Sequence, residues 1–239
     1  MFAAYTMAQL REQLTKGQDR NLLSVISRFH QDIKPKPIPE KQERNFLIEL
    51  CKELNSNITP KATQTQNEKA IIEITNNTFK NYDLELKYCG FYEPDKKNPE
   101  RTNPRPYNIG IGCSGIPIYE GVIGTTVRLY GKSVYIIDVA ALEKEDPKAH
   151  FSCDSSMQGA EIVIALRAEY KTGPQKGKSA TRMTLDLDIS RKNALSIPGA
   201  TLLEEIILPF MRITFPEPPV YEPLEGIHTP KNLNVLANH

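Results

Sequence analysis

Two aspartates in the second half of the chain could act together chemically. Asp186 and Asp188 alternate with Leu185, Leu187 and Ile189, the period of a β-strand whose alternate side chains share one face. On an exposed face the aspartates would only improve solubility. On an interior face they would be costly without a cationic partner, because each disfavours ionisation of the other. We expect the apolar residues to enter the core and the aspartates to point toward a pocket.

The four cysteines are the candidate redox groups. Cys51, Cys89, Cys113 and Cys153 are too few and too scattered for a disulfide framework, and none forms a C-x-x-C pair. We therefore expect reduced thiols and a cytoplasmic location. Cys51 and Cys89 lie in helix and strand patterns and are expected in the core. Cys153 follows His150, which could lower its pKa, although a lone cysteine is also a common small core residue.

Composition argues against several other classes of function. The 30 Lys and Arg residues nearly balance the 29 Asp and Glu residues, for a formal charge of +1, so no overall field favours nucleic acid or an anionic membrane. We expect no signal peptide and no membrane span, since no run approaches about 20 apolar residues. There is no glycine-rich phosphate loop, and His150 with Cys153 supplies only two metal ligands, so no metal is expected.

Helical periodicity occurs in four segments. The predicted helices are residues 19–29, 40–54, 67–79 and a last helix from about residue 198. The proline-rich segment 34–39 cannot continue the first helix and predicts a stiff linker. After the last helix, prolines from residue 216 onward indicate an extended tail.

Strand patterns occupy the region between these helices. Predicted strands cover residues 84–88, 107–112, 133–139, 160–166 and 183–189. Residues 95–106 are rich in Lys, Arg, Asn and Pro and are predicted to be a loop. The turn-rich segment 171–178 predicts a hairpin joining the last two strands. The result is an α+β fold, a central antiparallel sheet flanked by helices on one side.

Four ordered segments resemble one family, the free methionine-(R)-sulfoxide reductases. They are the strand Tyr88-Cys89-Gly90-Phe91-Tyr92, the segment Cys113-Ser114-Gly115-Ile116-Pro117 with Gly121-Val122-Ile123-Gly124-Thr125, the segment His150-Phe151-Ser152-Cys153-Asp154 continuing to Glu161-Ile162-Val163, and the strand Leu185-Asp186-Leu187-Asp188-Ile189. The resemblance covers about residues 84–211 and implies a GAF-like domain. We assign that domain to residues 67–213, an N-terminal helical extension and linker to 1–66, and a proline-rich tail to 214–239.

The resemblance also implies catalytic roles. Reduction of a sulfoxide needs a thiolate to attack sulfur, an acid to protonate the oxygen, and a second thiol to resolve the sulfenic acid. By resemblance Cys153 is the nucleophile and Cys113 resolves it. Glu161 or Asp188, with its pKa raised by burial, would be the acid. No cofactor is implied beyond an external thiol reductant such as thioredoxin.

Substrate binding is implied for an overlapping set. Asp186, Asp188 and Glu161 would hold the ammonium group of a free amino acid, and Tyr88 would cover the methyl sulfoxide. The sequence departs from the family pattern at three of its positions, since Ile123 replaces the middle cysteine, Tyr88 replaces a tryptophan, and Gly115 stands where the family often has arginine.

These departures keep two alternatives open. The first is a catalytically degenerate GAF domain that serves as a structural or interaction subunit of a larger assembly through its N-terminal helices and C-terminal tail. The second is a small-molecule sensor. The expected partners of the enzyme are its small-molecule substrate and a thioredoxin-like reductant.

Overall fold

The computed structural model describes residues 37–94, 101–112, 116–117, 133–141, 159–169 and 179–216. These residues form a six-stranded sheet with the order β3-β2-β1-β6-β5-β4, in which every neighbouring pair is antiparallel. The strands are β1 (Leu86–Pro94), β2 (Arg101–Ile109), β3 (Ile116–Pro117), β4 (Val134–Ile136), β5 (Ala160–Glu169) and β6 (Ser179–Ile189). The helices are α3 (Glu40–Asn57), α4 (Gln64–Asn81) and α7 (Ile197–Thr214).

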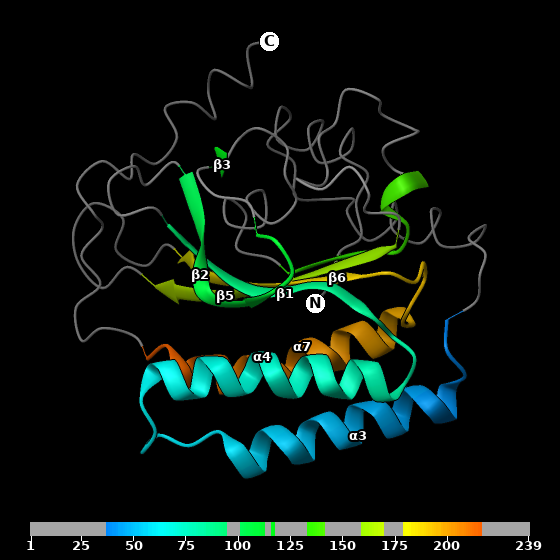
Figure 1. Cartoon of the computed structure of the whole chain (residues 1–239), viewed down its shortest axis with the longest axis horizontal. Helices are drawn as coiled ribbons and strands as arrows, with labels where there is room; N and C mark the ends of the chain where they lie inside the picture. Colours follow the sequence, from blue (N-terminus) through cyan, green and yellow to red (C-terminus); the bar gives the residue numbers. More distant parts are fainter. Residues whose placement is uncertain are drawn as a thin grey trace.

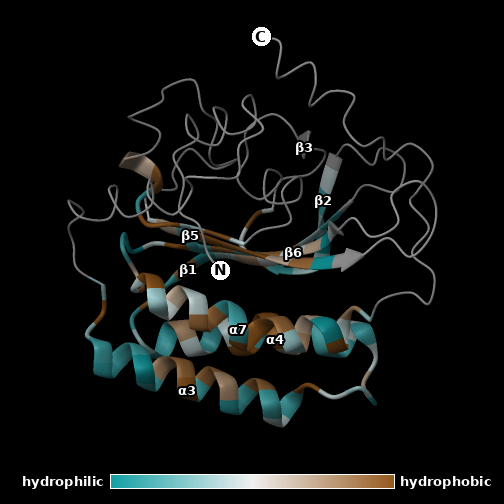
Figure 2. Ribbon diagram, turned by 180° about the vertical axis from the view of Figure 1, so that it is seen from behind, coloured by the Kyte–Doolittle hydropathy of each residue, from teal (hydrophilic) through white to brown (hydrophobic). Residues whose placement is uncertain are grey.

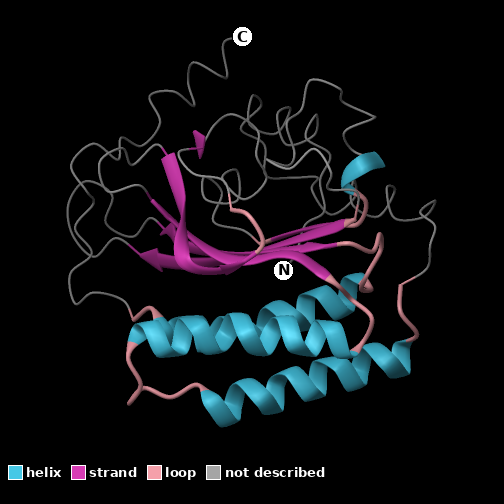
Figure 3. Ribbon diagram, in the orientation of Figure 1, coloured by secondary structure: helices cyan, strands magenta, loops and turns pink. Residues whose placement is uncertain are grey.

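Helices α3, α4 and α7 lie on one face of the sheet, whereas a short helical turn at residues 139–141 lies on the other side (Figures 1 and 3). Helices α4 and α7 contact the strands directly, and α3 packs against both of them from the outside. Hydrophobic residues are frequent along α7, whereas hydrophilic residues cover much of α3 (Figure 2). The predicted α+β arrangement, with its long helices on one side, is confirmed.

The core lies between the sheet and the helices. Alternate residues of β5 and β6 point into the core, because successive side chains of a strand point to opposite faces of the sheet and only one face covers the helices. Phe46, Leu50 and Leu54 of α3 belong to the same core and are fully buried. Helix α3 therefore packs as part of this domain, although the predicted boundary after residue 66 stays a prediction.

Two helix starts are fixed by side chains. Thr63 and Gln66 form a capping box at α4, in which the Thr63 hydroxyl accepts from the Gln66 amide at 3.2 Å and Gln66 Oε1 accepts from the Thr63 amide at 2.8 Å. Ser196 caps α7 by accepting from the Gly199 amide at 3.0 Å. These bonds satisfy amide groups that the first helical turn leaves without partners.

The prediction of a loop over residues 95–106 is wrong for its second half. Strand β2 begins at Arg101 and contains Pro104 and Pro106. Its ladder with β1 changes register between Gly90 and Tyr92, and its described pairing with β3 stops at Thr102. Prolines are tolerated at such bulges and edges because no ladder hydrogen bond is lost there.

Most of the remaining element predictions that fall on described residues are confirmed, but the strand predicted at 107–112 ends with β2 at Ile109. Helices α3, α4 and α7, strands β1, β4, β5 and β6, and the antiparallel pairing of β5 with β6 lie where the sequence predicts them. The predicted helix at 19–29 and most of the predicted tail lie outside the described residues. Among the described helices, none is both long enough and apolar enough to cross a membrane.

Candidate functional site

Strand β6 separates the core from the candidate site. Leu185 and Leu187 are fully buried among the helix-facing residues. Asp186 and Asp188 lie on the opposite face of the strand because side-chain direction alternates. The prediction that the aspartates turn away from the helical core is confirmed.

The strand register gathers further candidates around the aspartates. Asp188 pairs with Tyr88 of β1 on one side and with Glu161 of β5 on the other. Tyr88, Asp188 and Glu161 therefore form one cross-strand row. In the next row along the strands, Asp186 lies between Gly90 and Val163.

The three carboxylates form a compact cluster. One carboxylate oxygen each from Glu161, Asp186 and Asp188 lies within 4.8 Å of the other two. Glu161 is only 3% exposed, and Asp186 Oδ1 is buried with no hydrogen-bond partner among the described residues. Burial raises the pKa of Asp186 well above its usual range, and the charge of Asp188 raises it further.

Tyr88 closes one side of this cluster. Its side chain is 4% exposed, and burial raises the pKa of its hydroxyl, which therefore stays protonated. The Tyr88 hydroxyl lies directly over Gly90, where a Cβ atom would collide with it, and near Gly112, where a Cβ atom would lie 3.0 Å away. The two glycines thus leave the space that the tyrosine side chain occupies.

Two polar residues on the same face were not singled out from the sequence. Thr184 pairs with Tyr92 in the row beyond Asp186, and its hydroxyl is buried with no hydrogen-bond partner among the described residues. The ring centroids of Tyr92 and Tyr88 are 5.7 Å apart. The alternation that identified the two aspartates also places Thr184 on their face, so this residue could have been found.

Such a cluster is suited to a cation. Buried polar groups without partners usually bind a ligand, an ion or water, and a positive charge would relieve the repulsion among the carboxylates. A primary ammonium group offers three donors to these oxygens, and a divalent cation is also bound by carboxylate oxygens. Glu161, Asp186 and Asp188 are the described residues that could hold either one.

The predicted cysteine chemistry is only partly visible. Cys113, His150 and Cys153 lie outside the described residues. Cys89 is buried as predicted, and burial raises the pKa of its thiol above the usual range. The prediction for Cys51 is wrong, because this residue is exposed on α3. It lies at the margin of the apolar face of the helix, beside a groove toward α7.

Neither protein-family models nor curated protein sequences match this chain. Several solved structures are similar to it. A GAF domain structure superposes with a TM-score of 0.53 at 17% identity, covering 72% of this chain and 87% of that one. The free methionine-R-sulfoxide reductase of Neisseria meningitidis, solved in complex with its substrate, superposes with a TM-score of 0.51 at 18% identity, covering 76% and 95%. The chain therefore has the GAF fold, which free methionine-R-sulfoxide reductases share.

Proposed function

We propose that this chain reduces free L-methionine-(R)-sulfoxide with thiols as the electron source. The observation that carries the proposal is the cluster of Glu161, Asp186 and Asp188 beside the buried Tyr88, on the sheet face away from the helices. The ordered sequence segments and the GAF fold agree with it.

The carboxylates provide the basis for substrate selection. The ammonium group of a free amino acid would donate charge-assisted hydrogen bonds to Asp186, Asp188 and Glu161. A peptide-bound sulfoxide has a neutral amide at that position and brings no positive charge to the carboxylates. Tyr88, at the edge of the cluster, offers an aromatic surface for the methyl sulfoxide end of the substrate.

The redox steps would use Cys153 and Cys113. The Cys153 thiolate attacks the sulfoxide, takes up its oxygen as a sulfenic acid, and releases methionine after one proton is supplied. A protonated carboxyl group is a suitable donor, and Glu161, which is 3% exposed, or Asp188 would supply it. Cys113 then displaces water from the sulfenic acid to form a disulfide, which an external dithiol such as thioredoxin reduces.

Turnover of purified protein tests this proposal. The substrates are free methionine-(R)-sulfoxide, the S epimer, and N-acetylmethionine sulfoxide, which has no ammonium group, each with a thioredoxin system or dithiothreitol. We expect methionine to be released from the free R epimer alone. Equal turnover of the N-acetyl compound would contradict the role of the carboxylates.

A second function is favoured by the replacement of the family's middle cysteine by Ile123. A GAF domain that has lost part of its disulfide relay could still bind its ligand and act as a sensor, or as a subunit of an assembly. Calorimetric titration separates these possibilities from the enzyme. Binding of free methionine or its sulfoxide without turnover supports a sensor, and neither binding nor turnover supports a structural subunit.

A further inference from the structure

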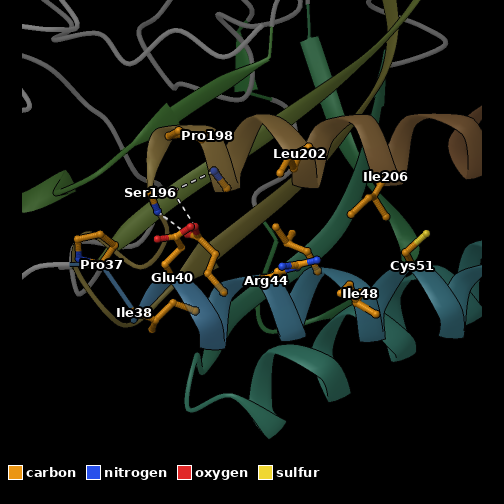
Figure 4. Close-up of a pocket in the computed structure, with 13 residues that line it drawn as sticks. Pro37, Ile38, Glu40, Arg44, Ile48, Cys51, Ser196, Pro198, Leu202 and Ile206 are labelled. Atoms are coloured by element: carbon orange, nitrogen blue, oxygen red, sulfur yellow. Dashed lines mark hydrogen bonds between the residues drawn. The ribbon is translucent and has the colours of Figure 1, made fainter.

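An apolar groove lies between α3 and α7, remote from the carboxylate cluster (Figure 4). Its volume is about 810 Å³, and its apolar walls include Ile38, Leu47, Ile48, Leu202 and Ile206. Ile48 and Leu202 face each other's helices yet remain 43% and 48% exposed. Two large apolar side chains on opposite walls of one groove leave a surface that is suited to cover by another apolar segment.

Contacts between α3 and the first turn of α7 fix the two helices beside the groove. Glu43 of α3 accepts hydrogen bonds from the Ser196 amide and from the Ser196 hydroxyl, both at 2.6 Å. Gly199 of α7 packs so closely on the Glu43 carboxylate that a Cβ atom there would collide with it. The first turn of α7 is therefore fixed against α3, and the space between the helices is preformed.

We propose that residues 19–29 of this chain form an amphipathic helix that occupies the groove. In this segment Leu22, Leu23, Ile26 and Phe29 recur at helical spacing and would lie on one face. An amphipathic helix placed in an apolar groove buries such a face, which is a recurrent mode of recognition. The proposal is independent of the function proposed for the carboxylate cluster.

The position of the segment in the chain favours it over other occupants. The described part of the chain begins at Pro37, and both Pro37 and Ile38 line the groove. Residues 30–36 connect this point to the segment and reach up to about 25 Å when extended. A helix of residues 19–29 is about 16 Å long. The connection therefore permits the helix to return along α3, at an effective concentration in the millimolar range.

Cys51 offers a readout because it is exposed and lines the groove. Its rate of modification by a bulky maleimide, followed on its own peptide by mass spectrometry, reports cover of the groove. We expect the double variant Leu22→Asp/Ile26→Asp to raise this rate about ten-fold, because local opening exposes the thiol. Ser24→Asp is the matched control, since residue 24 lies on the opposite side of the predicted helix, and it should leave the rate unchanged.

A second measurement tests contact directly. Oxidation should form a disulfide between Cys51 and a cysteine introduced on the apolar face of the segment, as Leu22→Cys, Leu23→Cys, Ile26→Cys or Phe29→Cys, and not with one introduced as Ser24→Cys. Equal Cys51 labelling in all variants, together with no disulfide, would overturn the proposal. Protection of Cys51 that rises with protein concentration, with a doubled mass that Leu202→Asp abolishes, would overturn it in favour of a second copy of the chain.

Discussion

Glu161 of β5 and Asp188 of β6 face each other as a registered cross-strand pair. Like charges in this position are unfavourable in an ordinary sheet. With Asp186 their oxygens lie within 4.8 Å of one another. A ligand that carries positive charge would turn this repulsion into binding energy, and the first predictions follow from that relationship.

Replacing one carboxylate by its amide should reduce activity much more than stability. Asp188→Asn removes one acceptor for the substrate ammonium. It should lower kcat/KM for free methionine sulfoxide, with a loss of about 2 to 4 kcal/mol in the free energy of transition-state binding. The fold should remain, because removing one of several like charges relieves repulsion. Steady-state kinetics and thermal unfolding measure the two effects.

The matched control for this prediction is Glu73→Gln. Glu73 is 57% exposed on α4 and, among the described residues, pairs with Lys69 at the surface. It should change neither activity nor stability appreciably. An Asp188→Asn variant as active as Glu73→Gln would show that the cluster does not bind the substrate.

The contribution of Asp186 to stability should fall as the pH rises. Its folded-state pKa is raised by burial and by Asp188. The folded protein therefore binds a proton at this residue more tightly than the unfolded chain, in which the pKa of an aspartate is about 3.9. The contribution is present below that value and is lost as the pH rises through the folded pKa.

Denaturant unfolding at a series of pH values measures this effect. The free energy of unfolding of Asp186→Asn should rise relative to that of the wild type as the pH increases from about 4 upward, because the asparagine does not ionise. Parallel curves for the two proteins would indicate that Asp186 has an ordinary pKa.

Gly90 should be essential for the position of Tyr88. A Cβ atom at residue 90 would collide with the Tyr88 hydroxyl and lie 2.7 Å from Asn108 Cβ. Gly90→Ala should therefore displace the tyrosine and lower stability by about 1 to 3 kcal/mol, as overpacking does. Adding Tyr88→Phe removes the colliding hydroxyl and should restore part of the loss. A double-mutant cycle from chemical unfolding measures the coupling, and strictly additive effects would contradict it.

The faces of β6 were predictable, whereas their neighbours were not. The alternation of Leu185 and Leu187 with the two aspartates directly gives the side to which each points. That Tyr88 and Glu161 flank Asp188 depends on β6 lying between β1 and β5. Strand order brings together residues that are distant in the chain, and local periodicity contains no information about it.

The incorrect predictions have equally local causes. Helical spacing assigned Cys51 to the apolar face of α3, but periodicity cannot distinguish the centre of a face from its margin, where the groove begins. Pro104 and Pro106 suggested a loop, because the short pairing of β2 with β3 and the change of register against β1 follow from tertiary pairing.

The buried ion pair between Arg105 of β2 and Glu68 of α4 should contribute more to stability than a surface pair. Arg105 Nε lies 2.9 Å from both oxygens of Glu68, whose side chain is fully buried, and its Nη1 lies 2.6 Å from Glu93 Oε2. Burial raises the pKa of Glu68, and Arg105 opposes that rise. Arg105→Met would leave Glu68 without its cation and should destabilise the fold by about 3 to 5 kcal/mol.

The exposed pair of Lys87 with Glu85 provides the comparison. Its atoms are 3.3 Å apart, and the side chains are 55% and 68% exposed. Lys87→Met should cost less than about 1 kcal/mol, because water screens such pairs. Chemical unfolding of both variants tests the difference, and similar losses would mean that Glu68 finds another partner when Arg105 is absent.

The cysteines should react in an order that follows their environments. Brief treatment with iodoacetamide should leave Cys89 unmodified in the native protein, because it is buried and its pKa is raised. Cys153, if it is the nucleophile, should react first, ahead of the exposed Cys51, since an activated thiol has a larger thiolate fraction at neutral pH. Peptide mapping by mass spectrometry gives the four rates, and repeating it in denaturant supplies the control, because unfolding removes the differences in environment. A Cys153 that reacts no faster than Cys51 in the native protein would remove the catalytic role proposed for it.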